Sequence, residues 1–133
     1  MLITRECDYA VRIIRALANV ERLCISEICE KEGLTPAFGY KILNKLEHAG
    51  FVKSFRGSHG GYALNTSLKR ITLLDLYLTV DQSFYMIECL NPDKKCARNP
   101  KDDVCKVHTE LNRIQQIMMN ELGSKTIQEI LEN

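Results

Sequence analysis

The chain has 133 residues, of which 45% are hydrophobic and 26% are charged, and its formal net charge is +1 at pH 7. This length supports a single compact unit with a small core. Charged residues at Arg5, Glu6, Asp8 and Arg12 interrupt the region where a secretory signal would be apolar, and no uncharged stretch is long enough to cross a bilayer, so we expect a cytoplasmic protein without a membrane partner. In that reducing compartment, six cysteines favour metal, redox or packing roles over a disulfide framework.

The nearly balanced charge conceals a basic segment. Between Thr35 and Arg70 there are six basic residues and one acid, a local net charge of +5 that leaves −4 for the rest of the chain. A local excess of this kind suits the neutralisation of nucleic-acid phosphates, although a solvated surface can have the same composition. The charge pattern therefore indicates nucleic acid as a candidate partner.

Three helices are predicted in the first fifty residues. Thr4 is a possible cap for the first, whose apolar stripe has helical spacing: Ala10, Ile13, Ile14, Leu17 and Ala18. Ser26 is the cap candidate for a short second helix, which Gly33 is placed to end. Thr35-Pro36 then begins a third helix, which Gly50 closes and whose buried face comprises Gly39, Ile42, Leu43 and Leu46.

The second and third helices, joined by a tight turn, are the elements of a helix-turn-helix. Two β-prone runs follow at residues 51–55 and 62–64. Residues 56–61 between them contain three glycines, which supply the backbone freedom that a hairpin tip requires. The sequence therefore predicts a mainly α fold with a small β-hairpin wing, that is, a winged helix-turn-helix.

A fourth helix is predicted from Thr72 to Val80, with Asp75 completing a capping box. Periodicity then lapses for about twenty residues, and such a stretch in a small domain is usually functional or disordered. A long helix follows Asp103, and its apolar seam suits packing against another helix, most simply that of a second copy: Val104, Val107, Leu111, Ile114 and Met118.

Thr126 and Glu129 form a capping box for a short terminal helix. We therefore expect three parts: a winged helix-turn-helix at residues 1–80, a cysteine-bearing sensor loop at 81–103, and a dimerisation helix with a short C-terminal helix at 104–133. No phosphate-cradling glycine loop, serine-histidine-acid grouping or two-histidine zinc helix is present in the sequence, so we expect a protein that is not an enzyme.

Three cysteines, Cys89, Cys96 and Cys105, lie in or beside the irregular stretch, and His108 follows the last of them. Because few of the surrounding residues can form a core, these cysteines are not expected to serve packing. Thiolates suit iron-sulfur clusters, zinc or copper(I), and three thiolates with one further donor make a four-ligand site. Cys24 and Cys29, at apolar spacing around the second helix, are instead expected to be buried packing residues.

With these motifs in place, the sequence resembles the IscR/NsrR-like (Rrf-type) family of bacterial winged helix-turn-helix transcription regulators. The resemblance covers nearly the whole chain and rests on residues 1–4, 8–10, 56–57, 60–64 and 126–131 together with the cysteine stretch. It implies a homodimer that binds a palindromic operator in double-stranded DNA. It also implies a cysteine-ligated iron-sulfur cluster, 2Fe-2S or 4Fe-4S, that tunes DNA affinity.

The resemblance places DNA contacts at the start of the third helix and in the wing: Thr35, Ala37, Phe38, Tyr40, Lys41, Arg56, Gly57, Ser58, His59 and Gly60. Lys45, further along the same helix, is added as a candidate phosphate contact because of its charge. The start of a recognition helix reaches base edges, lysines meet phosphates, and an arginine on a slim hairpin can enter a minor groove. Tyr40 stands where related proteins have a carboxylate or amide that distinguishes bases, so the operator sequence cannot be copied from them.

The cluster ligands implied by the resemblance are Cys89, Cys96, Cys105 and His108, and Asp8 of the partner subunit is the alternative fourth ligand. We prefer His108, because it lies one helical turn from Cys105. Six and then eight residues separate the cysteines, a longer spacing than is usual in the family. Two alternatives stay open: a cluster-free regulator of the same fold that responds through thiols or zinc, and a redox or metal-carrier protein.

Overall fold

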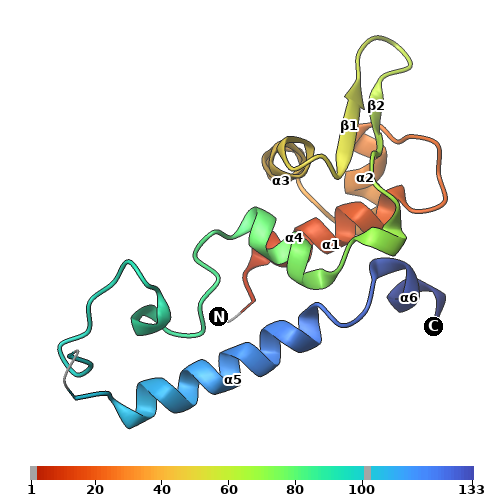
Figure 1. Ribbon diagram of the computed structural model, residues 1–133. Coiled ribbons are helices and arrows are strands. Elements are labelled where there is room, and N and C mark those ends of the chain that lie inside the picture. The colour runs from red at the N-terminus through yellow and green to blue at the C-terminus, as the bar shows by residue number, and fades with distance from the viewer. Residues whose placement is uncertain (1–2, 101–102) are drawn as a thin grey trace.

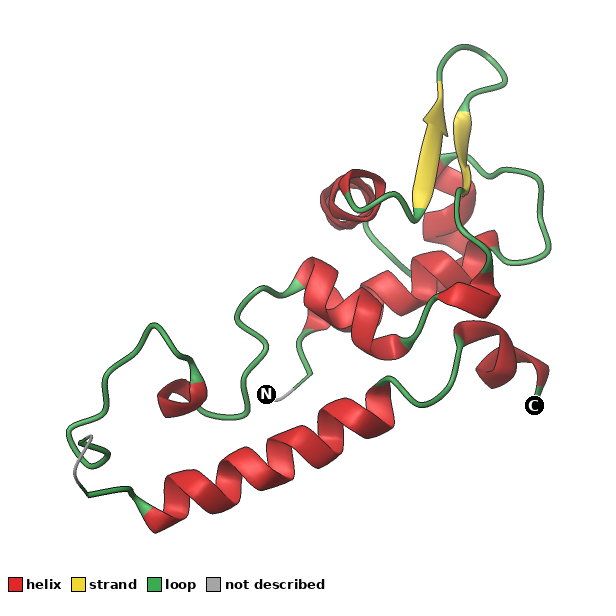
Figure 2. Ribbon diagram, viewed as in Figure 1, coloured by secondary structure: helices red, strands yellow, loops and turns green. Residues whose placement is uncertain are grey.

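The computed structural model describes residues 3–100 and 103–133, so Met1 and Leu2 of the N-terminal motif and Lys101 and Asp102 of the predicted sensor loop lie outside the described residues. The described elements are, in chain order, α1 (Arg5–Leu17), α2 (Ile25–Glu32), α3 (Pro36–His48), β1 (Val52–Phe55), β2 (Gly61–Leu64), the 3-10 helix η1 (Leu68–Arg70), α4 (Leu73–Val80), the 3-10 helix η2 (Glu88–Leu90), α5 (Lys106–Leu122) and α6 (Ile127–Glu132). The fold is mainly helical with one antiparallel hairpin, as predicted (Figure 2).

Helix α1 is the centre of the winged helix-turn-helix, because it packs against α2, α3 and α4. Thr4 caps it by accepting a hydrogen bond from the backbone N–H of Cys7, as predicted for the cap. Its predicted apolar stripe is buried, and it meets the buried face of α3 formed by Ile42, Leu43 and Leu46. Each fully buried side chain of this size contributes about 1.5–3 kcal/mol, so this contact fixes α3 relative to α1.

The predicted cap of α2 at Ser26 is wrong, because the helix begins at Ile25 and Cys24 is the N-cap residue. The reason is a non-local contact: the backbone of Leu23 pairs with Tyr62 through two hydrogen bonds, 2.9 and 2.7 Å long, and the chain turns into the helix directly after this bridge. The predicted end is confirmed, since Gly33 adopts the left-handed conformation at φ 70°.

The wing projects from one end of the molecule (Figure 1). Strands β1 and β2 pair antiparallel from Val52 opposite Leu64 to Phe55 opposite Gly61. Glycine is required where the hairpin meets the bridge: a Cβ at Gly61, whose φ is 144°, would lie 2.5 Å from the carbonyl oxygen of Leu23. The bridge and the hairpin therefore form one compact base for the wing tip.

The long helix α5 lies on the opposite side of the molecule from the wing, and the mostly irregular segment after α4 leads to it (Figures 1 and 2). The predicted capping boxes of α4 and α6 are both present. After α5 the chain returns to the winged helix-turn-helix, where the backbone N–H of Ile127 donates to the carbonyl of Ile71 at 2.7 Å and the Ile127 side chain is buried. Within the described part of the chain, no helix is long and apolar enough to span a membrane.

Candidate functional site

The exposed face of α3 carries most of the predicted base contacts. Pro36 occupies the first turn, where its missing N–H costs nothing, and the extended backbone of Thr35 starts the helix. The side chains of Thr35, Ala37 and Tyr40 are exposed. Phe38 is half-buried, because its ring packs edge-on against that of Tyr9 with the centroids 5.6 Å apart. The start of α3 thus presents hydroxyl, methyl and phenol groups to solvent.

The two lysines of α3 lie close to a carboxylate of α1. The Nζ of Lys41 is 2.5 Å from one carboxylate oxygen of Glu6, and the Nζ of Lys45 is 2.6 Å from the other. Lys45 also donates to the backbone carbonyl of Val80 at 2.9 Å. The hydrogen bonds from Lys41 and then Lys45 lower the pKa of Glu6 below its ordinary value, so the carboxylate is charged at neutral pH. The sequence analysis did not anticipate this arrangement.

The wing tip presents Arg56, Gly57, Ser58 and His59 to solvent, while Gly60 is half-buried. The backbone N–H of Gly60 donates to the carbonyl of Gly57 at 3.0 Å, which closes the turn. A Cβ at Gly60 would lie 2.6 Å from the carbonyl oxygen of Phe55. The turn is therefore tight at Gly60, where there is no room for a side chain.

Sequence reasoning missed Arg22, which lies between α1 and α2 and supports the wing. Its guanidinium stacks over the ring of Phe55, 4.0 Å from the centroid, and donates to the carbonyl of His59 at 2.8 Å. The signal was weak, because the partners are 37 residues apart in the chain. Between α3 and the wing lies a groove of about 410 Å³, and its lining includes Cys24, Tyr40, Ser54 and Arg56.

The three candidate ligand cysteines are half-buried thiols on the segment that precedes α5. Cys89 lies in η2, Cys96 in the following loop, and Cys105 is the N-cap residue of α5. The backbone N–H of His108 approaches the sulfur of Cys105 at 3.5 Å, and Asn99 accepts from the backbone N–H of Cys105 at 2.9 Å. Cys105 and His108 thus share the first turn of one helix.

Within residues 3–100 and 103–133, no three His, Cys, Asp or Glu side chains are arranged to hold a metal ion. One observation nevertheless fits a ligand there: the Nδ1 atom of His108 is buried and has no hydrogen-bond partner among the described residues. A set of three thiols and one unpaired imidazole nitrogen also has the donor chemistry that iron-sulfur clusters and zinc require.

The alternative ligand and the remaining cysteines have other surroundings. Asp8 is exposed and pairs with Arg12 at 3.0 Å on the same helix. Cys29 is buried, as predicted. The same prediction is wrong for Cys24, which is half-exposed because it is the N-cap of α2, where its sulfur lies 3.0 Å from a carboxylate oxygen of Glu27.

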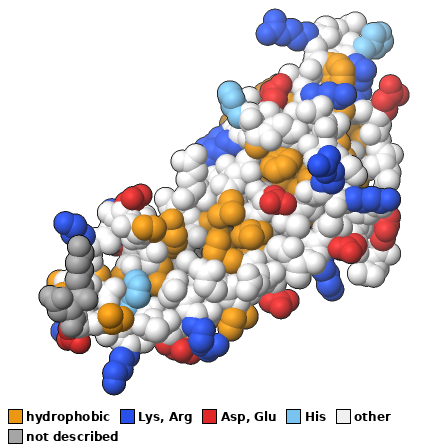
Figure 3. All heavy atoms as spheres, viewed as in Figure 1, with side chains coloured by type: hydrophobic (Ala, Val, Ile, Leu, Met, Phe, Trp, Pro, Cys, Tyr) orange, Lys and Arg blue, Asp and Glu red, His pale blue; other side chains and the backbone are white. Residues whose placement is uncertain are grey.

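Helix α5 leaves apolar side chains uncovered. Val107 is 66% exposed, and Ile114 and Ile117 are also exposed. The predicted seam is wrong for Val104, which is 61% exposed but lies before the helix, because Cys105 is the N-cap residue of α5. Figure 3 shows hydrophobic side chains at the surface along α5 and between it and α4. The one buried side chain of α5 is Gln115, whose amide oxygen accepts from the backbone N–H of Met86 at 2.7 Å. This bond fastens the segment before η2 to the middle of α5.

A recognition helix beside a glycine-rich wing, with a cysteine-bearing segment and a long helix attached, is typical of the class of winged helix-turn-helix transcription regulators. A family model described as Rrf2, iron-dependent transcriptional regulator, matches residues 3–133. The chain therefore belongs to the Rrf2 family of transcription regulators, whose members bind DNA and are not enzymes.

Individual proteins agree with this assignment. Protein aau3 of Rhizobium meliloti is 33% identical over 134 residues, which cover 99% of this chain and 86% of that protein. The HTH-type transcriptional regulator NsrR of Bacillus licheniformis is 26% identical over 137 residues, covering 100% of this chain and 94% of that protein. The oxidized form of Staphylococcus aureus CymR has the same fold, with a TM-score of 0.78 at 18% identity, covering 100% of this chain and 98% of that chain.

Proposed function

We propose that this chain is a homodimeric transcription regulator that binds a palindromic operator and whose DNA affinity depends on an iron-sulfur cluster held by its own cysteines. The observation that carries the proposal is that α5 joins two parts of the chain. One part is the surface formed by the recognition helix and the wing. The other is the cysteine segment between α4 and α5: the proposed ligands Cys105 and His108 lie at the start of α5, and the Gln115–Met86 bond connects the middle of α5 to the rest of this segment. Such a regulator acts on chromosomal DNA, so we place it in the cytoplasm.

The exposed side chains of α3 and the wing support the proposed DNA contacts. Tyr40 is placed to meet base edges in the major groove, where its phenol can hydrogen-bond and its ring can contact a thymine methyl. The hydroxyl of Thr35 makes no capping hydrogen bond within the described structure and can donate to a phosphate. Arg56, on the wing tip, is suited to an adjacent minor groove. Dimers of this class bind two half-sites about one duplex turn apart.

Dimerisation is supported by the uncovered apolar side chains of α5. A single exposed apolar side chain is ordinary, but Val107, Ile114 and Ile117 together on one long helix are typical of a helix–helix interface. Pairing α5 with its copy across a two-fold axis buries them and fixes the distance between the two recognition helices.

The proposed ligands are Cys89, Cys96, Cys105 and His108, with Asp8 of the partner subunit as the alternative fourth ligand. When bound, an iron-sulfur cluster supplies a centre that reacts with oxidants and nitric oxide. The chain's own residues do the rest: three thiolates and an imidazole tie residues 89–105 to the first turn of α5, and Gln115 ties the preceding segment to its middle. Release of the four side chains frees residues 89–105 and thereby changes the position of α5 and the spacing of the recognition helices.

The remaining alternative is a cluster-free regulator that senses through thiols or zinc. It is supported by the absence of a preassembled ligand set among the described residues and by free, half-buried thiols. The name of one structural relative, an oxidized form of CymR, agrees with thiol chemistry in a protein of this fold. The carrier alternative is set aside, because membership of the Rrf2 family makes the chain a regulator.

Anaerobic purification separates the two. We expect a coloured protein that contains iron and sulfide, and loss of the visible absorption in Cys105→Ala, with Cys24→Ala as the matched control. Loss of colour in His108→Ala assigns the fourth ligand, whereas its retention favours Asp8 of the partner subunit. DNA titrations with the cluster intact and stripped should give different dissociation constants; a colourless, iron-free protein, or equal constants, contradicts the proposal.

A further inference from the structure

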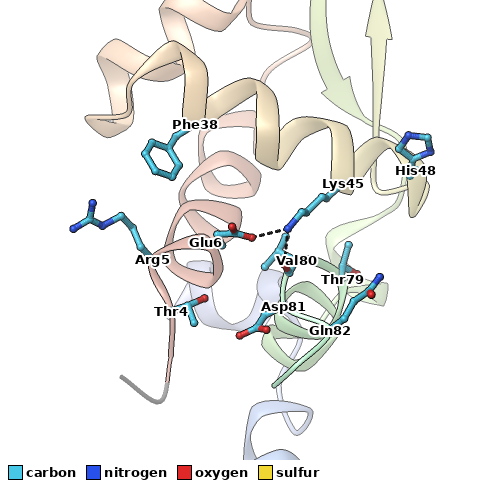
Figure 4. Close-up of a pocket in the computed structure, with 10 residues that line it drawn as sticks. All are labelled: Thr4, Arg5, Glu6, Phe38, Lys45, His48, Thr79, Val80, Asp81 and Gln82. Carbon is cyan, nitrogen blue, oxygen red and sulfur yellow. Dashed lines mark hydrogen bonds and ion pairs between the residues drawn. The ribbon is translucent and has the colours of Figure 1, made fainter. Parts of the chain in front are cut away.

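The carboxylate of Glu6 bridges the two lysines of the recognition helix. In Figure 4 the Glu6 side chain points from α1 toward Lys45 on α3, at the edge of a hollow of about 830 Å³ between α1, α3 and α4. Its two oxygens lie 2.5 Å from the Nζ of Lys41 and 2.6 Å from that of Lys45. A carboxylate that accepts from two ammonium groups makes the same kind of charge-assisted contact that a DNA phosphate makes with lysine.

The two lysines are fixed to different degrees. Lys45 has a second contact, with the carbonyl of Val80, and its side chain is 37% exposed. Lys45 therefore connects α3 to α1 and α4. The side chain of Lys41 is 53% exposed, and Glu6 is its ion-pair partner among the described residues. Lys41 can thus leave Glu6 for a phosphate without breaking another contact, while Glu6 keeps its bond to Lys45.

We infer that Glu6 is an affinity-setting residue, which competes with the DNA backbone for Lys41. When Lys41 turns to a phosphate, its ion pair with Glu6 breaks, and the carboxylate remains as a negative charge close to the DNA backbone, which offsets part of the charge that Lys41 contributes at the phosphate. Glu6 therefore weakens binding to duplex DNA and makes it less dependent on salt. This inference rests on the proposed DNA binding through α3 and the wing.

The test uses the full-length protein, purified anaerobically, and a fluorescently labelled duplex of random sequence, titrated between about 50 and 200 mM salt. We expect Glu6→Gln to tighten binding roughly threefold at the lower salt, the order typical of surface ion pairs. The slope of log affinity against log salt should steepen by about 0.9, as for one added phosphate contact. Glu132→Gln, the same charge change on α6, is the matched control and should alter neither quantity.

A double-mutant cycle separates competition from a general charge effect. In the Lys41→Gln background, Glu6→Gln should bring little further gain, because the lysine over which carboxylate and phosphate compete is gone. Glu6→Ala, which removes both acceptor oxygens, should agree with Glu6→Gln, and thermal melts confirm that each variant is folded.

The outcomes are distinct. If the wild type binds and Arg56→Ala weakens it, but the Glu6 variants bind no more tightly or gain equally with and without Lys41, the inference is overturned and the proposed function stands. If the wild type shows no salt-dependent binding to duplex DNA, the proposed function fails, and the role of Glu6 fails with it.

Discussion

The winged helix-turn-helix differs from the region formed by the cysteine segment and α5 in the number of side chains that it buries. All of the largest fully buried side chains lie between Cys7 and Leu76, within the winged helix-turn-helix. Among the described residues of 81–122, the buried side chains are Phe84, Leu90 and Gln115. The first region is therefore stable through its own packing. The second buries few side chains of its own, so we expect it to open more readily than the first.

The largest difference should come from truncating the core. Leu43→Ala on α3 removes a fully buried side chain next to α1, and we expect it to cost about 2–5 kcal/mol of the free energy of unfolding. Ile87→Ala, in the cysteine segment, removes a side chain that is 45% exposed and should cost less than about 1 kcal/mol. Urea unfolding followed by circular dichroism measures both, and equal losses would contradict the division drawn above.

The base of the wing should be the next most sensitive point. Gly61→Ala places a methyl group against the Leu23 carbonyl at a φ of 144°, so we expect a loss of about 1–3 kcal/mol together with weaker DNA binding. Gly57→Ala is the control: its φ of 95° also disfavours alanine, but no atom lies within 4 Å of the added Cβ. Because Gly57 is itself a predicted DNA contact, melting temperatures make the comparison, and a smaller loss of stability at Gly61 than at Gly57 would refute the packing argument.

The bond between Gln115 and the cysteine segment should have a local effect. Gln115→Leu leaves the backbone N–H of Met86 without its acceptor, at a cost of about 1 kcal/mol. Limited proteolysis should then cut the segment between α4 and α5 faster, with little change in the melting of the winged helix-turn-helix. Gln116→Leu, an exposed neighbour, is the control. Unchanged proteolysis would mean that other contacts hold the segment to α5.

The smallest effect concerns acid stability. The lysine contacts lower the pKa of Glu6 below its ordinary value of 4.5, so the stability that they contribute is fully present above that pH. It is lost as pH falls through the depressed pKa of the folded state, because the protonated carboxyl no longer pairs with Lys41 and Lys45. Thermal melts across acidic pH should show a shallower decline for Glu6→Gln than for the wild type. A parallel decline would show that this carboxylate does not contribute.

Local signals in the sequence were sufficient to predict where most of the helices begin or end. Thr4, Thr72 and Thr126 act as caps through neighbours three residues away, and Gly33 ends α2 by its own backbone conformation. Such features depend on short stretches of chain, so periodicity and capping rules find them.

The features that the sequence did not predict depend on contacts between residues that are far apart in the chain. The start of α2 is set by the pairing of Leu23 with Tyr62, and the support of the wing comes from Arg22. The partners of Lys41 and Lys45 on Glu6 are 35 and 39 residues away. The candidate metal ligands could be proposed only from residue type and family resemblance, because no local rule brings Cys89 and Cys96 to His108.

The hydrogen bond between Ile127 and Ile71, with the bridge between Thr72 and Thr126, has a mechanical consequence for α5. It clamps the C-terminal end of that helix to the winged helix-turn-helix, while the other end begins at Cys105 in a sparsely packed segment. The helix has 17 residues and is about 25 Å long, and its fixed end lies near Gly123. A tilt of a few degrees about Gly123 would therefore displace Cys105 far more than Leu122. In the proposed dimer, the α5 helices of the two subunits would have to tilt together.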